Sequence, residues 1–425
     1  MLLSIKATFK KIIDSNLIFG IIAAIFIFSL IFTVHVRAGK DLKVGLYGVA
    51  QISEKKSPYD NPLDPPRPLF RYAPGFVILQ SPFFLKSEMT APFEFKNIAP
   101  SVFAWYAACI LSLFFSGFLL RRLIPALTEK KASQNLKLSF LMAMPLVGYE
   151  LSNGQNKLIA LVFMLAALFF FEKNKTLLSS FFFNLALTVY IPLFAFIFYF
   201  ILRSRGKFIL DFIVGVLLVF FILPSLVYGF DFNLFLLKSW FLRCLQPFFM
   251  TTSYVTYIDL RTSSQTLPSA LGRLFVSGHT HTFKYLISPV VLHFLIRFFS
   301  AVIVFFSCLA VAKTSDLKAR GLGVAIFLIL ALILPSYCIY YTWAWLFVIY
   351  FAVFNYLSYP EVRTGEKKLL TVLVWILFVS SWLISVHFFN RHSFLFWATL
   401  VFWLGLTIVL IQKPFGNTKP AFHAK

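Results

Sequence analysis

The sequence predicts an all-α polytopic membrane protein of about twelve transmembrane helices, and three observations predict it. Of its 425 residues, 60% are hydrophobic and 13% are charged, with a mean hydropathy of +0.83. Soluble domains are nearer half apolar and a quarter charged. Apolar runs such as residues 17–34 are long enough to cross the hydrocarbon core as a helix. Lys and Arg gather in the short breaks between these runs, as they do beside membrane helices.

The charged breaks divide the chain into about twelve apolar helices, all within one membrane domain that covers residues 1–425. In order, we expect helices over residues 17–36, 98–120, 138–152, 157–171, 177–189, 190–202, 208–228, 287–312, 321–335, 337–357, 369–388 and 393–412. Basic residues precede the first run and no small-residue cleavage site follows it, so we interpret it as a retained helix and not a signal peptide.

The basic breaks assign one side of the protein to the cytoplasm. They comprise residues 121–131, 172–175, 203–207, 313–320 and 363–368. The positive-inside rule then predicts cytoplasmic N- and C-termini in a bacterial cytoplasmic (inner) membrane. This topology requires residues 177–202 to form two short half-helices, and Tyr190 and Pro192 mark the expected break.

Two long segments, residues 37–97 and 229–286, are then predicted to face the outside. In the second segment Phe232, Phe235, Leu236, Trp240 and Phe241 share one helical face, which is typical of a helix lying in the headgroup layer. Residues 42–53 show a weaker pattern of the same kind.

The charge and the cysteines exclude other classes of protein. The net charge of +23 lies in the basic breaks, so membrane lipids are its expected partner and nucleic acid is not. Four cysteines are too few for a disulfide framework, and no CxxC or HExxH motif occurs. We therefore expect no metal site. His279 and His281 alone would make a poor one, although either could contact a phosphate or simply belong to a loop. No cofactor is expected.

Four stretches together resemble glycosyltransferase family 87. The first begins with Asp41 after helix one and continues through SPYDNP to FRYAPG at residues 70–75. The other three are NGQNK followed by an apolar helix, NLALTVYIPLF at 184–194, and SSQTLPSALGRLF at 263–275. The order of the four along the chain is the order in the family.

The resemblance implies a GT-C-type helical bundle with two long outer loops that carry short interfacial helices. It also implies inverting, metal-independent transfer of a sugar such as mannose from a polyprenyl phosphate, at the outer face of the membrane. Asp41 matches the family's presumed general base. The family's Lys in the third stretch is replaced by Val189 or Tyr190, and Tyr340 or Tyr341 stands where a His is expected.

Candidate site residues follow from these stretches. For the donor phosphate we expect Arg261, Gln265, Arg273 and His279, since an Arg fork matches phosphate oxygens. For the acceptor or the cleft we expect Tyr59, Asp60, Arg71, Tyr72, Asn153, Gln155, Asn156, Lys157, Tyr340 and Tyr341. Structural roles stay open: Asp41 could cap a helix, Asp60 could form a turn, and the outer aromatic and Arg side chains could anchor the protein at the lipid headgroups.

The expected function is therefore a hexosyltransferase that moves one sugar from a polyprenyl-phosphate sugar donor to a hydroxyl of a lipid or glycan acceptor. Two alternatives share the helices and the basic outer cleft: a flippase or transporter of lipid-linked sugar, and an outer-face oligosaccharide ligase. A transporter would not need Asp41 on a structured loop. A ligase would take its glycan from a diphosphate lipid.

Overall fold

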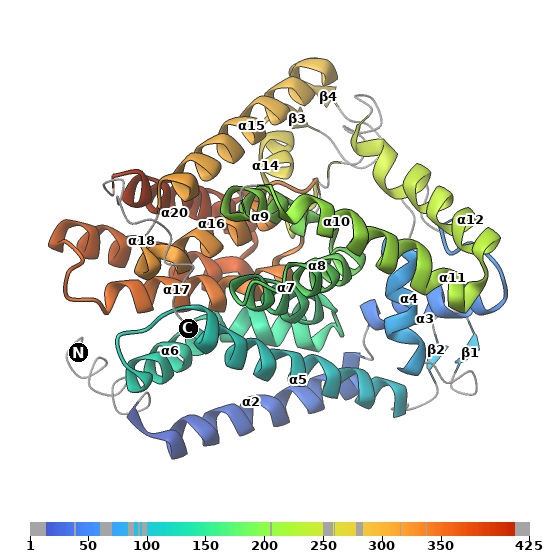
Figure 1. The fold of residues 1–425 in the computed structure, drawn as a ribbon, viewed down its shortest axis with the longest axis horizontal. Coiled ribbons are helices and arrows are strands. Elements are labelled where there is room, and N and C mark those ends of the chain that lie inside the picture. The colour runs from blue at the N-terminus through green and yellow to red at the C-terminus, as the bar shows by residue number, and fades with distance from the viewer. Residues whose placement is uncertain are drawn as a thin grey trace.

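The computed structural model describes residues 14–37, 40–59, 70–83, 89–91, 94–95, 100–204, 206–249, 258, 260–277, 284–314, 316–336 and 338–412. Across these ranges the fold is helical, as expected. The exceptions are an isolated bridge and two short antiparallel ladders, Met89–Ala91 (β1) with Glu94–Phe95 (β2) and Val276–Ser277 (β3) with Lys284–Tyr285 (β4). The molecule has a broadly triangular outline (Figure 1).

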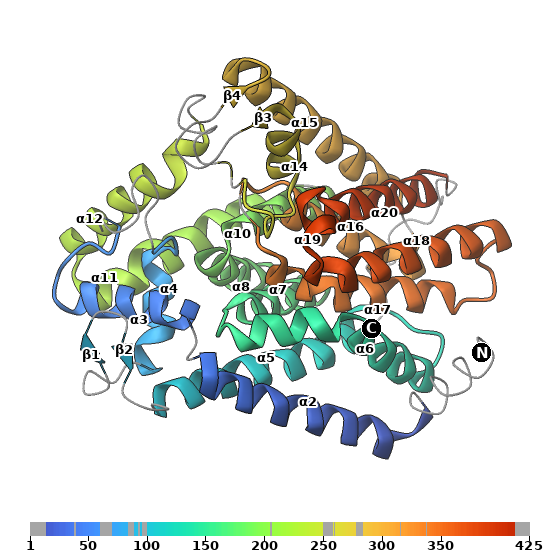
Figure 2. The same cartoon turned by 180° about the vertical axis from the view of Figure 1, so that it is seen from behind.

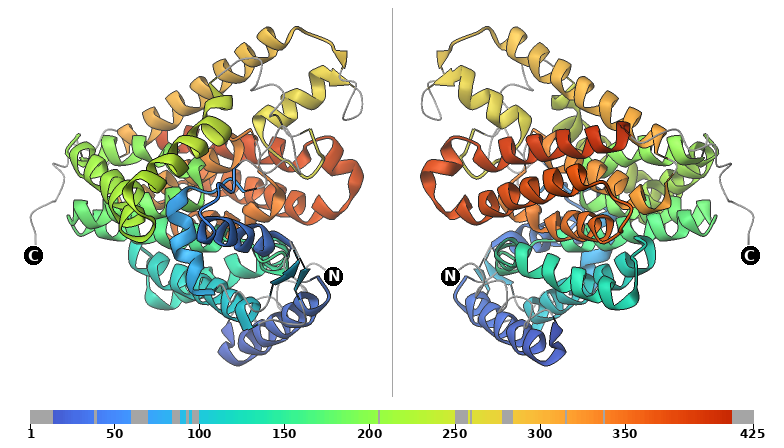
Figure 3. Two further views of the ribbon diagram at one scale, coloured as in Figure 1. Left: turned by 90° about the vertical axis from the view of Figure 1, so that its right-hand side faces the viewer. Right: turned by 90° about the vertical axis from the view of Figure 1, so that its left-hand side faces the viewer.

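The N-terminal helices lie at one edge of the molecule. Helix α2 (Asn16–Arg37) packs on α6 (Glu129–Ser152) through Phe19 and Phe26, whose rings meet Phe140 edge-on. In side view α2 lies at the opposite extreme from α15 (Pro289–Lys313) (Figure 3). Helix α5 (Pro100–Leu123) follows the first long loop.

Helix α3 (Lys40–Ser53) packs against α4 (Pro74–Gln80) and the segment before it. Its buried face includes Leu42, Leu46, Val49 and Ile52, in agreement with the amphipathic pattern expected for residues 42–53. A Cβ at Gly48 would lie 2.2 Å from the Phe70 ring, so only glycine allows this approach. The short helix η1 (Ser81–Phe83) follows α4.

Helices α6 (Glu129–Ser152) and α7 (Lys157–Glu172) form one sharply bent pair, with an angle of 119° between them. Helix α6 begins nine residues earlier than expected, inside the basic break, because the Thr128 hydroxyl accepts a hydrogen bond from the Lys131 N–H and caps it.

The expected break within residues 177–202 is confirmed. Helix α8 (Thr176–Val189) ends at Tyr190, whose backbone is extended (φ −149°, ψ 91°). Pro192 then lies in the first turn of η3 (Ile191–Ala195), and α9 (Phe196–Ser204) follows. Proline is suited to that position because its missing N–H has no helical partner there.

The second long segment begins after a continuous span made of α10 (Phe208–Val216), η4 (Leu217–Ile222) and α11 (Leu223–Tyr228). Helix α12 (Phe230–Trp240) continues through η5 (Phe241–Leu245) and η6 (Gln246–Phe248). The predicted apolar stripe is divided: Leu236 and Trp240 are buried in the protein, whereas Phe235 and Phe241 are exposed.

The C-terminal half contains the most deeply buried helices. Its elements are α14 (Leu267–Phe275), α15, η7 (Leu317–Ala319), α16 (Arg320–Ile333), η8 (Tyr340–Trp345), α17 (Leu346–Leu357), α18 (Thr364–Trp382), η9 (Leu383–Ser385), α19 (His387–Arg391) and α20 (Phe394–Ile411). Residues 321–333 of α16 are all buried, so this helix is part of the core. Figure 2 shows α18 and α20 grouped beside α16 and α17.

Several apolar helices identify a membrane-embedded protein, but fewer of them than twelve have the length to span a bilayer. Of the residues described, four helical stretches are long and apolar enough, and the bent α6–α7 pair could supply a fifth. The four stretches are Phe103–Leu123, Phe208–Tyr228, Pro289–Lys313 and Phe394–Ile411. Helices such as α8 and α17, of 14 and 12 residues, are shorter than the ~20 residues that a hydrocarbon core requires.

Candidate functional site

The bend between α6 and α7 is a tightly held turn. Asn153 ends α6, and its side-chain amide donates to the Tyr149 carbonyl oxygen at 2.8 Å. Gly154 adopts a left-handed backbone (φ 65°), which glycine tolerates best. Helix α5 holds the turn from the side, because the Trp105 indole donates to the Gly154 carbonyl at 2.9 Å. The thiol of Cys109, one turn further along α5, donates to the Gln155 carbonyl at 3.3 Å.

Lys157, the first residue of α7, is nearly buried, with 8% of its surface exposed. Its ammonium nitrogen lies 5.2 Å from the ring centre of Tyr72 and 4.8 Å from that of Tyr190, and it donates to Asn156 Oδ1 at 3.1 Å. Trp345 fixes the backbone here, since its indole donates to the Lys157 carbonyl at 3.0 Å and its ring meets Tyr190 edge-on. Four segments far apart in sequence therefore converge on one cation. We call Tyr72, Asn156, Lys157, Tyr190 and Trp345 the lysine cage.

A carboxylate that the sequence analysis missed lies beside the lysine cage. Glu150 is fully buried, and its Oε1 accepts the backbone N–H of Lys157 at 2.7 Å. A lone acid at the end of an apolar helix, seven residues before a lysine, was the available signal. Burying a carboxylate is costly unless it is hydrogen-bonded, and the Lys157 backbone N–H supplies one such bond to Glu150.

The first long loop brings Tyr72 to the lysine cage. The hydroxyl of Tyr59, itself buried, donates to the Tyr72 carbonyl at 2.8 Å. The Trp240 indole of α12 donates to the Arg71 carbonyl at 3.1 Å, so both long loops support this segment. Burial raises the pKa of the Tyr59 hydroxyl well above its ordinary value, and the hydroxyl stays a hydrogen-bond donor.

Asp41 is the second residue of α3, and its side chain lies outside the described residues, as does the whole of Asp60. The helix that carries Asp41 connects to the lysine cage through aromatic contacts. Gly48 of α3 lies against the Phe70 ring, and Phe70 meets Tyr72 edge-on with ring centres 5.4 Å apart.

The predicted phosphate residues of the second loop form a separate clamp. The Arg273 guanidinium donates to the carbonyl oxygens of Arg261 and Ser264, both at 2.8 Å, and to the Ser393 hydroxyl. The Gln265 side-chain amide donates to the carbonyls of Thr262 and Asn390 at 2.7 and 3.1 Å. We call Gln265, Arg273 and these partners the loop clamp. Its observed bonds tie α14 to the segment before α20, and His279 lies outside the described residues.

Cys338 joins the loop clamp to the lysine cage. Its carbonyl oxygen accepts the Gln265 N–H at 3.2 Å, and Ser264 pairs with Ile339 as an isolated bridge. The Cys338 thiol contacts the hydroxyls of Tyr190 and Thr342, and burial raises its pKa to about 11. Tyr340 and Tyr341 begin η8 directly after this bridge, and their side chains lie outside the described residues.

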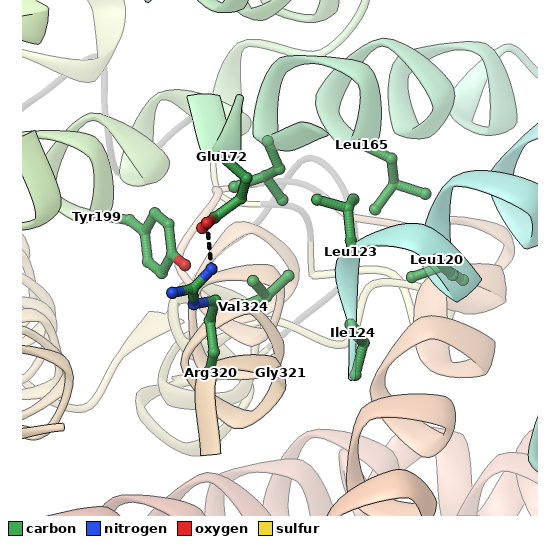
Figure 4. Close-up of a pocket in the computed structure, with 10 residues that line it drawn as sticks. Leu120, Leu123, Ile124, Leu165, Glu172, Tyr199, Arg320, Gly321 and Val324 are labelled. Carbon is green, nitrogen blue, oxygen red and sulfur yellow. Dashed lines mark hydrogen bonds and ion pairs between the residues drawn. The ribbon is translucent and has the colours of Figure 1, made fainter. Parts of the chain in front are cut away.

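A small cavity of about 10 Å³ lies near the other end of α7 and not at the lysine cage. Figure 4 shows Glu172, Arg320 and Tyr199 on one side of it and Leu120, Leu123, Ile124 and Leu165 on the other. Glu172 and Arg320 form an ion pair. This volume has room for one water molecule and for no sugar. Within the described part of the chain, no three His, Cys, Asp or Glu side chains are grouped to hold a metal ion.

The fold and the lysine cage define the class of protein as a membrane-embedded helical protein with a buried polar site that contacts its two long loops. The model of glycosyltransferase family 87 matches residues 70–335, which is well over half of the chain. The protein belongs to that family and is a glycosyltransferase. No curated protein matches the chain. The matched residues include the bend, Tyr190, Gln265 and Arg273, while Asp41, Tyr340 and Tyr341 lie outside them.

Proposed function

We propose that the protein transfers a single sugar, with mannose as the candidate, from a polyprenyl-phosphate donor to a hydroxyl of a lipid or glycan acceptor. The single observation that carries this proposal is the lysine cage in a member of family 87. It provides a buried cation, hydrogen-bonding amides and aromatic faces between the two long loops, a combination suited to a sugar phosphate. The match to family 87 over residues 70–335 gives the reaction class, which is glycosyl transfer.

The proposed reaction is one displacement at the anomeric carbon. The acceptor oxygen forms a bond to that carbon as the carbon–oxygen bond to phosphate breaks, and the electron pair goes to the phosphate oxygen. The acceptor proton goes to the Asp41 carboxylate and then to water. The configuration inverts, and polyprenyl phosphate leaves as a stable anion, so no general acid is required. Asp41 would perform best with a pKa raised toward neutral by a partly dry site.

We also propose that the site faces the outside of a bacterial cytoplasmic membrane, with both termini in the cytoplasm. The basic ends of α9 and α15 and the Lys318 side chain lie in the sequence breaks assigned to the cytoplasm, while both long loops lie in the segments assigned to the outside. Single cysteines tested with an impermeant maleimide should react from outside at positions 60 and 255 and not at 205 or 318. Labelling at 205 from outside would overturn this orientation.

The test of the function is transfer by membranes supplied with radiolabelled polyprenyl-phosphate mannose. Wild type should transfer the label, and Asp41→Asn should lose about 10²–10⁴ in rate, the usual contribution of a positioned general base. Asp60→Asn is the matched control and should lose far less. Equal losses in both variants would identify Asp41 as a helix cap. Movement of the labelled lipid across the bilayer without transfer would instead support a flippase.

A further inference from the structure

The lysine cage contains the most deeply buried ammonium of the candidate site, and it provides a cation for the leaving phosphate. We propose that Lys157 binds the phosphate of the donor lipid and neutralises the charge that develops there, a role the sequence had suggested for Arg261 and Arg273. This inference rests on the proposed transfer from a polyprenyl phosphate. It assigns the recognition of the phosphate to one residue on α7.

The first argument is the environment of the ammonium. A lysine that is 8% exposed lies in a low dielectric, where its attraction to an anion is much stronger than in water. Its contacts with the Tyr72 and Tyr190 rings are electrostatic contacts with ring faces. The three donors of an ammonium can rotate, so Lys157 can direct a hydrogen bond to a phosphate oxygen while remaining between the two rings.

The second argument is the different use of the arginines. The guanidinium of Arg273 already donates to two backbone carbonyls and to Ser393, and these bonds hold α14 in place. Turning that planar fork toward a phosphate would break them. Arg261 has an exposed side chain, where water weakens any attraction. The loop clamp therefore suits a structural role and the lysine cage suits the anion.

The third argument is the connection between the lysine cage and the helix that carries Asp41. Asp41 precedes Gly48 by seven residues, or about 10 Å of helical rise. Gly48 touches Phe70, Phe70 touches Tyr72, and the ring of Tyr72 faces the Lys157 ammonium. One continuous chain of packed groups thus leads from the helix that carries the proposed base to the proposed phosphate ligand.

The chemistry of the step explains why a cation is required there. The donor phosphodiester carries one negative charge. When its bond to the anomeric carbon breaks, the leaving oxygen keeps the electron pair and the phosphate gains a second negative charge. A cation fixed beside that oxygen stabilises the transition state more than the ground state, which accelerates the reaction. Glu150 holds the start of α7 in place, because its carboxylate accepts the Lys157 backbone N–H.

The test measures binding of farnesyl phosphate and of farnesol to the detergent-purified full chain by calorimetry. The two probes share the prenyl chain and differ only in the phosphate. Wild type should bind the phosphate more tightly than the alcohol. Lys157→Met should weaken binding of farnesyl phosphate at least tenfold and leave farnesol unchanged, and Lys157→Arg should keep most of the affinity. Lys173→Met is the matched control, since Lys173 follows the opposite end of α7 with an exposed side chain, and it should bind as wild type.

The outcomes separate this inference from the proposed function. If wild type binds both probes equally, no phosphate site exists and the proposed function itself fails. If wild type prefers farnesyl phosphate and transfers sugar, but Lys157→Met binds it equally well, the function stands and the role of Lys157 is overturned. Should Lys157→Met fail to fold, because Glu150 is left as a buried charge, the double variant Lys157→Met/Glu150→Gln restores the charge balance and decides the question by the same criterion.

Discussion

Helix α7 has a polar group at each end, and the two ends differ in what surrounds them. At Lys157 the cation lies among aromatic rings and amides, beside a carboxylate with no exposed surface. At Glu172 the carboxylate pairs with Arg320, and about a quarter of each side chain remains exposed. Water can replace a lost partner at the second end but has little access to the first. An ion pair that water reaches holds helices together, whereas a buried cation among aromatic rings is suited to binding an anion.

The largest expected effect comes from removing the buried acid. Glu150→Leu deprives the buried Lys157 N–H of its acceptor. A buried donor left without a partner typically costs about 1–3 kcal/mol, and because this acceptor is a carboxyl group we expect a loss of about 3 kcal/mol in the free energy of unfolding. Denaturant titration in detergent measures it. A loss below about 1 kcal/mol would mean that the bond from the Lys157 N–H to Glu150 does not stabilise the bend.

At the opposite end of α7 the same experiment should have a smaller result. Arg320→Met removes the partner of Glu172 but leaves a carboxylate that water reaches, so the expected loss is about 1–2 kcal/mol, between the values for surface and buried pairs. Transfer and farnesyl phosphate binding should be unchanged. The comparison between the two ends fails if Arg320→Met destabilises the protein as much as Glu150→Leu, or if it weakens binding of the phosphate probe.

The sequence predicted the positions of the helices better than their surroundings. The distribution of basic residues together with Pro192 was enough to place the break at Tyr190. The twelve expected spans are not confirmed, since four of the described helical stretches, or five with the bent pair, have the length and composition of a span. An apolar run does not reveal whether protein or lipid covers it, and residues 321–333 of α16 are covered by protein. The stripe of α12 was divided for a similar reason: Trp240 is turned inward to donate to the Arg71 carbonyl, a partner 169 residues away.

For the candidate site, the sequence supplied the members of the cluster and not their arrangement. Asn156 and Lys157 stood out as polar residues between two apolar runs, and Tyr72 followed from the first loop. Tyr190 was noted as part of the expected break and as a departure from the family's Lys, and its ring lies 4.8 Å from the Lys157 ammonium. The ammonium that contacts Tyr190 comes from α7, a different helix. No periodicity within one helix can predict such a contact between neighbours.

Backbone strain offers a smaller test of the same comparison. Gly154 in the α6–α7 bend and Gly206 in the turn after α9 both have positive φ, at 65° and 89°. Replacing either by Ala should cost about 1 kcal/mol in the free energy of unfolding, since side chains disfavour that region. Only Gly154→Ala should also raise the KM for the donor, because it shifts Asn156 and Lys157. Equal KM values for both variants and wild type would show that the bend does not position the lysine cage.

The last prediction concerns the alkylation rate of the Cys338 thiol, which reports whether water reaches the lysine cage and requires no change in stability. Burial raises the pKa of this thiol from the ordinary 9.0 to about 11. Only the thiolate reacts with iodoacetamide, and each pH unit below the pKa lowers its population about tenfold. At pH 8 iodoacetamide should therefore modify Cys338 about 100-fold more slowly in the folded protein than in the denatured chain. The rate should rise about tenfold per pH unit up to about pH 11, as followed by mass spectrometry of the Cys338 peptide.

The denatured chain is the control, and its alkylation rate should level off near pH 9. A folded protein whose rate also levels off near pH 9 would have a hydrated thiol beside Tyr190, and the lysine cage would then be open to water, as the Glu172 end is.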